Sequence, residues 1–251
     1  MFDNTCKFLA ETFPADFASW LLGEAIILTK LEPSELLVES IRADSIIFLE
    51  SKDTILHIEF QTCSDPNIPF RMADYRLRIH RKFPHREVQQ VVIYLKRETS
   101  HLVFQTRFQI GRLIHEFDVI RLWEQPTENF KQYVGLLPLA VLTKTINPTE
   151  TLSEVSKLID NIVDRNVKSN VAAATAIISG LALKKEVIQR LLRSEIMKES
   201  VIYQEILLEG KAEGKAEEKT QIALNMIHSG ISIDLIAQIT GLSLDQIQKL
   251  Q

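Results

Sequence analysis

Two acidic residues, Asp44 and Glu59, lie in neighbouring stretches that read as strands, and Gln61 follows Glu59 by two positions. In the segment TILHIEFQ alternate side chains share one face of a strand, so Glu59, Gln61 and His57 point the same way. For Asp44 to lie directly opposite Glu59 across a hairpin, Glu50 to Asp53 must form a four-residue loop. The two carboxylates would then be roughly 5 Å apart at Cβ.

Carboxylates this close repel each other unless a cation lies between them, and their oxygens suit Mg²⁺ or Mn²⁺. An ion held by Asp44 and Glu59 would bind a scissile phosphate and lower the pKa of a bound water, which Gln61 could orient. The pattern therefore predicts metal-dependent phosphodiester hydrolysis. The alternative is that Asp44 is a turn residue and Glu59 is a charge on an edge strand, facing solvent.

A basic stripe is expected beside these acids, on a helix from Phe70 to Phe83. Its members recur at i, i+4, i+7 and i+11, and they are Arg71, Tyr75, Arg78 and Lys82. Such a stripe suits contacts with the phosphate backbone of DNA. The alternative is an ordinary solvated helix face.

The elements that must position these residues form an α/β domain over residues 1–145. Two short helices separated by Pro14 are expected between Cys6 and Lys30. Period-two patterns rich in β-branched residues then predict the strands DSIIFLE, TILHIEFQ, VQQVVIYLK, HLVFQTRF and HEFDVIRLW. The helix between the second and third strands indicates a mixed sheet.

The rest of the chain is helical in pattern. We expect a helical extension over 146–208, which Asn147 and Pro148 introduce, and a charged helical tether over 209–220, which contains the repeated unit EGKA. Residues 221–251 predict a small helix-turn-helix-like module with caps at Ser232 and Ser243. Its last helix, SLDQIQKLQ, carries one Lys and no Arg, so packing or dimerisation is an alternative to DNA contact.

Composition excludes several function classes. The 251 residues are 45% hydrophobic and 25% charged, with a net charge of -4, which indicates a globular protein whose DNA contacts must be local. Cys6 and Cys63 form no zinc or disulfide pattern, and the scattered histidines form no HExxH motif. A GxSxG elbow and a phosphate-binding GxxxxGK[ST] loop are both missing. Without an apolar leader or membrane-length run, we expect a cytoplasmic protein with no membrane partner.

Three motifs occur in a characteristic order: an Asp that opens one strand (ADSIIF), E-x-Q at the end of the next (HIEFQ), and a helix reading F-R-x-x-x-Y-R-L. This arrangement resembles the Rpn family of recombination-promoting nucleases, also described as transposases, within the PD-(D/E)XK nuclease superfamily. The resemblance is clearest over residues 1–145 and extends to the EGKAEGKAEE run and the short terminal helices. It implies a mixed-sheet, restriction-endonuclease-like core with an α-helical C-terminal extension.

The resemblance also implies residue roles. Asp44 and Glu59 would be the metal ligands, the carbonyl of Phe60 would contribute, and Gln61 would replace the lysine of the superfamily. Glutamine offers a neutral amide where lysine brings a positive charge. A further glutamate on an N-terminal helix is often present in the superfamily, and the candidates are Glu24 and Glu39.

The function expected from these observations is Mg²⁺-dependent DNA endonuclease activity that promotes recombination. Two alternatives stay open. One is a DNA-binding module that keeps the nuclease fold without its chemistry. The other is an interaction protein that forms homo-oligomers through its C-terminal helices.

Overall fold

The computed structural model describes residues 2–24, 26–31, 46–192, 194–197, 199–229 and 231–250. The chain divides into two compact units, Met1–Ile202 and Tyr203–Gln251. No helix of the described residues is long and apolar enough to cross a membrane. The finer boundaries expected at 145, 208 and 220 stay predictions.

Two helices begin the first unit, α1 (Phe2–Thr12) and α2 (Pro14–Leu22). Pro14 stands at the start of α2, where its missing N–H costs no helical hydrogen bond. Gly23 ends α2 with φ 77°, a left-handed conformation that glycine adopts without strain. The two short helices predicted on either side of Pro14 are therefore confirmed.

A five-stranded sheet in the order β1-β2-β3-β4-β7 forms the centre of this unit. The strands are β1 (Thr29–Lys30), β2 (Ile46–Glu50), β3 (Thr54–Gln61), β4 (Glu87–Tyr94) and β7 (Asp118–Arg121). The pairs β1–β2 and β2–β3 are antiparallel, whereas β3–β4 and β4–β7 are parallel. The mixed α/β sheet expected from the sequence is confirmed.

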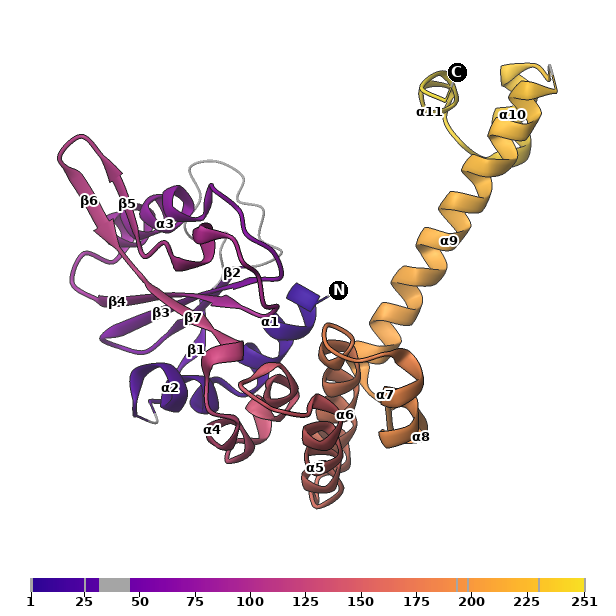
Figure 1. The fold of residues 1–251 in the computed structure, drawn as a ribbon. Helices are drawn as coiled ribbons and strands as arrows, with labels where there is room; N and C mark the ends of the chain where they lie inside the picture. Colours follow the sequence, from indigo (N-terminus) through magenta and orange to yellow (C-terminus); the bar gives the residue numbers. More distant parts are fainter. Residues whose placement is uncertain are drawn as a thin grey trace. The chain divides into compact units, whose positions relative to one another are not determined.

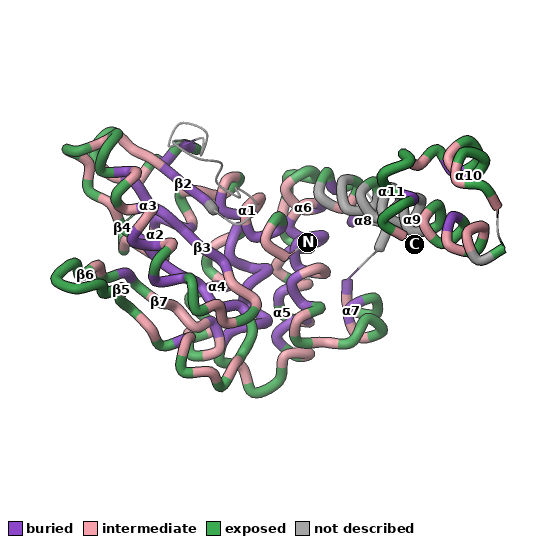
Figure 2. Tube along the Cα trace, turned by 90° about the horizontal axis from the view of Figure 1, so that it is seen from above, coloured by how far each residue is buried: buried purple, intermediate pink, exposed green. Residues whose placement is uncertain are grey.

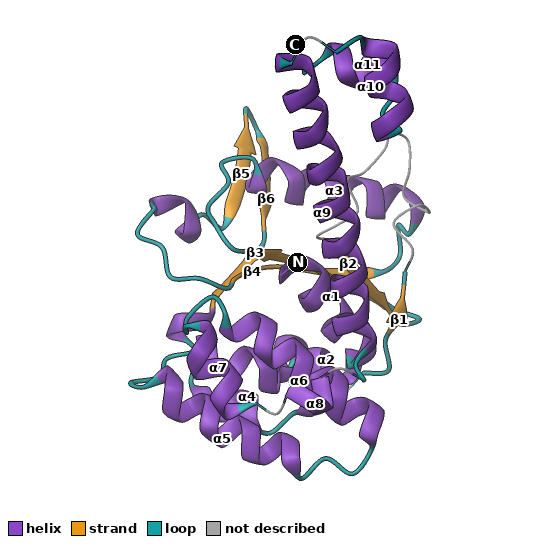
Figure 3. Ribbon diagram, turned by 90° about the vertical axis from the view of Figure 1, so that its right-hand side faces the viewer, coloured by secondary structure: helices purple, strands orange, loops and turns teal. Residues whose placement is uncertain are grey.

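Helices cover both faces of this sheet (Figures 1 and 3). On one face lies α3 (Ile68–Lys82), where Tyr75 packs edge to face against Phe48 of β2. On the other face Phe17 of α2 packs edge to face against Phe60 of β3. As a result β3 is buried on both sides, and every residue from Ile55 to Phe60 is buried (Figure 2).

The segment after β4 departs from the predicted strands. HLVFQTRF begins as a 3-10 turn, η2 (His101–Phe104), because the Ser100 side chain accepts a hydrogen bond from the Leu102 N–H. Its end forms β5 (Arg107–Ile110), which pairs with β6 (Leu113–Glu116) in a separate two-stranded sheet. HEFDVIRLW is likewise divided between β6 and β7. The β5–β6 hairpin is largely exposed (Figure 2).

Helices complete the first unit. They are η3 (Leu122–Glu124), α4 (Thr127–Lys131), η4 (Val134–Leu142), α5 (Pro148–Asp160), α6 (Arg165–Ser179), α7 (Lys185–Leu191) and α8 (Ser194–Met197). Asn147 caps α5 by accepting from the N–H groups of Thr149 and Glu150, which confirms the predicted helix entry. Because α6 contacts both η4 and α1, the helices that follow Asn147 in the first unit pack on the sheet domain.

The second unit contains most of α9 (Val201–His228), with α10 (Ile233–Thr240) and α11 (Leu244–Gln248). Residues 209–220, expected to form a tether, lie within α9. Ser232 precedes α10, Gly241 ends it with φ 69°, and Ser243 forms a capping box with Gln246. A small core of Ala223, Ile236 and Ile247 joins the three helices.

Candidate active site around Glu59

Glu59 lies near the end of β3, the middle strand of the five-stranded sheet, and its side chain is wholly buried. It points toward α3, which supplies its ion-pair partner Arg71. Burying a carboxylate is costly unless the group is paired and hydrogen-bonded. The alternative reading of Glu59 as an edge-strand charge facing solvent is therefore wrong.

Two donors hold one oxygen of this carboxylate. Nη2 of Arg71 donates to Oε1 of Glu59 over 2.6 Å, and Nε2 of Gln61 donates to the same oxygen over 3.1 Å. The other terminal nitrogen of Arg71, Nη1, lies 3.3 Å from Oδ2 of Asp65. Since 34% of the Arg71 side chain is exposed, the guanidinium closes the site toward solvent.

His57 and Gln90 extend the polar cluster along the sheet. Nε2 of Gln90 donates to the carbonyl of Met72 over 3.0 Å and lies 2.8 Å from Nδ1 of His57. An amide nitrogen has two N–H groups, so the second is directed at His57, which accepts it on Nδ1. His57 then carries its proton on Nε2, 3.8 Å from Oε2 of Glu59.

The second oxygen of Glu59, Oε2, is buried and has no hydrogen-bond partner among the described residues. An unsatisfied buried carboxylate oxygen is a position that a cation would stabilise, so this atom fits the expected divalent metal. Nε2 of His57 is not available as a ligand while it carries its proton. Within the described ranges, no three His, Cys, Asp or Glu side chains form a group able to hold a metal ion.

The hairpin register differs from the predicted one. Glu59 lies opposite Ile46, and β2 continues to Glu50, which pairs with Ile55. The loop therefore runs only from Ser51 to Asp53, and the predicted four-residue loop from Glu50 is wrong. Hydrophobic alternation does not detect this difference, because a shift of two residues keeps every side chain on its face.

The other acids predicted for the site are not seen beside Glu59 in the described part of the chain. Asp44 and Glu39 lie outside the described residues, and Glu24 is exposed just beyond α2. An acid that the sequence reasoning missed, Asp3 of α1, interacts electrostatically with the site. Burial raises the pKa of the Asp3 carboxyl, and the negative charge of Glu59 raises it further. No sequence spacing links Asp3 to Glu59, because only the fold brings α1 close to β3.

The predicted basic stripe is turned partly toward the sheet. Tyr75 is 6% exposed, and its ring packs edge to face against Phe48 and His57. Burial and the charge of Glu59 raise the pKa of Tyr75 to about 12. The predicted DNA contact by Tyr75 is therefore wrong, since a core-facing row has the same spacing as a solvent-facing stripe.

The three cations of the stripe have different surroundings. Arg71 is engaged by Glu59, and Nε of Arg78 lies 2.9 Å from Oδ2 of Asp74. Lys82 is exposed, with its amino group 5.4 Å from the centre of the Phe83 ring. The structure therefore makes Arg71 part of the acidic site. The signals for this role in the sequence were its position on the stripe and its place in the motif F-R-x-x-x-Y-R-L.

The second unit supplies the decisive similarity to known proteins. Residues 216–251 match the family model described as the Rpn/YhgA-like nuclease family, C-terminal HTH domain. Over these residues the chain is similar to the C-terminal domain of the Rpn/YhgA-like nuclease family. The matched residues include α10, α11 and the end of α9, so the Rpn resemblance expected from the sequence is confirmed there. No curated protein and no solved structure matches the chain.

Proposed function

We propose that this chain is a metal-dependent DNA endonuclease of the Rpn type, with Glu59 at the centre of its active site. The observation that carries the proposal is the wholly buried carboxylate of Glu59, one oxygen of which has no hydrogen-bond partner among the described residues. Buried ionisable groups in unsatisfied surroundings are typical of functional sites. The C-terminal nuclease-family domain favours hydrolysis of nucleic acid over other chemistry.

Glu59 would hold Mg²⁺ or Mn²⁺ through Oε2, together with Asp44 and the carbonyl of Phe60. When bound, such an ion supplies charge stabilisation at the phosphate and a water of lowered pKa. Asp44 and Glu59 are acceptor-only oxygen ligands when ionised, as these hard cations prefer. The PD-(D/E)XK assignment of the sheet domain belongs to this proposal.

Arg71 and Gln61 would prepare the carboxylate for this task. Both direct N–H groups at Oε1 of Glu59, so they fix the orientation of the carboxylate and leave Oε2 available. Arg71 is also partly exposed, with a second nitrogen turned to Asp65. A phosphate that approaches from solvent would meet this guanidinium first, and arginine matches phosphate geometry well.

DNA would bind through exposed cations on the α3 side of the sheet. Arg81 and Lys82 are exposed on α3, and Arg107 and Arg112 are exposed on the β5–β6 hairpin, which contacts α3. The helix-turn-helix unit would add a second point of attachment. These groups replace the predicted stripe as the proposed DNA-binding surface.

Substitution of the buried acid tests the proposal. Glu59→Gln keeps the shape of the side chain but removes its charge, so Mg²⁺-dependent nicking of supercoiled plasmid should fall by at least about a hundredfold. Asp44→Asn should have a similar effect. Thermal unfolding of both variants, followed by circular dichroism, should resemble that of the parent chain.

Asp65→Asn is the matched control, because Asp65 also pairs with Arg71 but lies closer to solvent. It should keep most of the nicking activity. Unchanged nicking by Glu59→Gln, together with DNA retention by the folded protein, would exclude the active site and leave a DNA-binding module.

A further inference from the structure

A polar cavity of about 600 Å³ lies next to the Glu59 cluster, at the edge of the sheet where β4 is not covered by β7. It opens because β7 pairs with β4 only from Val91 onward, so Glu87 to Gln90 have β3 on one side and the cavity on the other. The chain reaches β7 through the β5–β6 hairpin, which supplies the outer wall. The volume is in the range of sites for small organic ligands.

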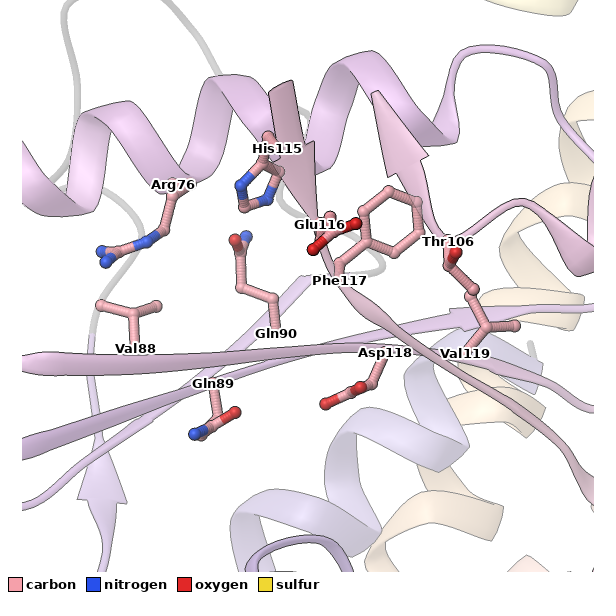
Figure 4. Close-up of a pocket in the computed structure, with 10 residues that line it drawn as sticks. All are labelled: Arg76, Val88, Gln89, Gln90, Thr106, His115, Glu116, Phe117, Asp118 and Val119. Atoms are coloured by element: carbon pink, nitrogen blue, oxygen red, sulfur yellow. The ribbon is translucent and has the colours of Figure 1, made fainter. Parts of the chain in front are cut away.

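The residues of the cavity divide between the two faces of the sheet (Figure 4). Arg76, Gln90 and His115 gather on the α3 side, whereas Gln89 and Asp118 point to the opposite side. This follows from the alternation of side chains along β4. The acid Asp118 is therefore directed away from the three nitrogen-bearing side chains.

Three buried polar atoms of this cavity have no hydrogen-bond partner among the described residues: Nη1 of Arg76, Oε1 of Gln90 and Nε2 of His115. Gln90 is only 4% exposed, so its free oxygen is not satisfied at an open surface. Leaving a buried donor or acceptor unpaired costs about 1–3 kcal/mol. Three such atoms around one cavity indicate that a polar ligand completes the site.

The chemistry of the three atoms restricts that ligand. The guanidinium of Arg76 suits a phosphate. Gln90 has no N–H group left for a ligand, because both are directed at Met72 and His57. Only its oxygen remains, and an amide oxygen accepts hydrogen bonds, so the ligand must bring a donor. Burial, then the positive charge of Arg76, lowers the pKa of His115, so His115 adds no second cation. Glu116, which also lines the cavity, disfavours a second anionic group.

We propose that this cavity binds one nucleotide, with its phosphate at Arg76 and an N–H group of its base at Gln90. The nucleotide is either a free mononucleotide or one unit of a nucleic acid strand. Through Gln90 and His57 the cavity is connected to Glu59 by successive contacts of 2.8 and 3.8 Å. A ligand bound in the cavity therefore affects the position of Glu59 through these contacts. Its binding does not require cleavage of DNA at the Glu59 site.

Calorimetric titration of the full chain tests the proposal with three probes: dAMP, inorganic phosphate and a short single-stranded oligonucleotide. Arg76→Gln removes the cation, and Thr106→Trp fills the cavity from an exposed position without a change of charge. Both variants should weaken binding of dAMP by at least about tenfold. Arg190→Gln, which changes an exposed arginine of α7 away from the proposed DNA-binding surface, is the control and should bind like the parent.

The three probes distinguish the sources of the nucleotide. If both variants lose binding of dAMP, the cavity is a site for free nucleotides. If both variants lose binding of the oligonucleotide alone, the cavity is a site for one unit of a strand. Inorganic phosphate that binds as tightly as dAMP overturns the proposal, as does equal weakening in Arg190→Gln or binding of no probe. Because binding is measured without nicking, these results are independent of the fate of Glu59→Gln.

Discussion

At the scale of single residues, the stability of this fold depends on how the buried charge of Glu59 is compensated. Arg71 donates to Oε1 over 2.6 Å, and the partner of a buried charge is costly to remove. Arg71→Met should therefore lower the free energy of unfolding by about 2 kcal/mol, less than for a wholly buried pair because 34% of the Arg71 side chain is exposed. Urea denaturation at neutral pH measures this loss.

A double-mutant cycle separates charge pairing from packing. When Glu59→Gln is present, no buried charge is left to compensate, so Arg71→Met should cost much less in that background. Asp65→Asn, which removes the more exposed partner of Arg71, should cost less than about 1 kcal/mol. An Arg71→Met loss of the same size in both backgrounds would contradict the pairing role.

Part of the arrangement of side chains around Glu59 could be predicted from the sequence. Period two along TILHIEFQ places His57, Glu59 and Gln61 on one face, and the structure brings the three side chains together. The burial of His57 and Glu59 could not be predicted, because it depends on α3 covering that face. The partner Gln90 belongs to another strand, and no local pattern indicates that its amide meets His57.

At the scale of elements, η4 meets the turn between α1 and α2 at a glycine. A Cβ on Gly135 would overlap the side chain of Phe13, and the Gly135 N–H donates to Oδ2 of Asp16 over 2.7 Å. Gly135→Ala should therefore lower the free energy of unfolding by about 2 kcal/mol, since overpacking forces the helices apart. Thermal unfolding with calorimetric detection provides the measurement.

Gly111→Ala serves as the comparison, because a Cβ there meets open space and only the left-handed backbone, φ 58°, is strained. Its cost should be about 1 kcal/mol and should be confined to the β5–β6 hairpin. If Gly135→Ala proved no more destabilising than Gly111→Ala, the close contact between η4 and Phe13 would be wrong.

Elements with strong periodicity could be predicted, whereas those fixed by local hydrogen bonds could not. The strand β3 follows the alternation of its apolar residues, and β4 contains the continuous β-prone run VVIY, which is wholly buried. HLVFQTRF has the composition of a strand, yet the Ser100 hydroxyl turns its first half into a 3-10 helix. Gly111, between two short β-prone segments, was the available signal for the hairpin.

At the scale of the whole molecule, the two units have separate cores. The C-terminal core consists of Ala223, Ile236 and Ile247, all of them within Tyr203–Gln251. The sequence predicted this unit well, because the Ser243 cap and the turn at Gly241 are local signals, although the Ser232 side chain makes no capping hydrogen bond at the start of α10. The helical tether predicted over 209–220 lies within α9, but the sequence did not predict that one unbroken helix runs from Val201 to His228, since the glycines of the tether weaken a helix.

Because the two units have separate cores, we expect that the C-terminal unit can be unfolded while the first unit stays folded. Ile236 is wholly buried, so Ile236→Asp places a charge in the small core and should destabilise that unit by more than about 3 kcal/mol. Leu235→Asp makes the same change at a neighbouring position that is 45% exposed, and it should be tolerated. Limited proteolysis of the full chain should cut the Ile236→Asp tail rapidly while leaving residues 1–202 intact. Rapid loss of both units would mean that they unfold as one, because a defect confined to α10 cannot otherwise reach the sheet.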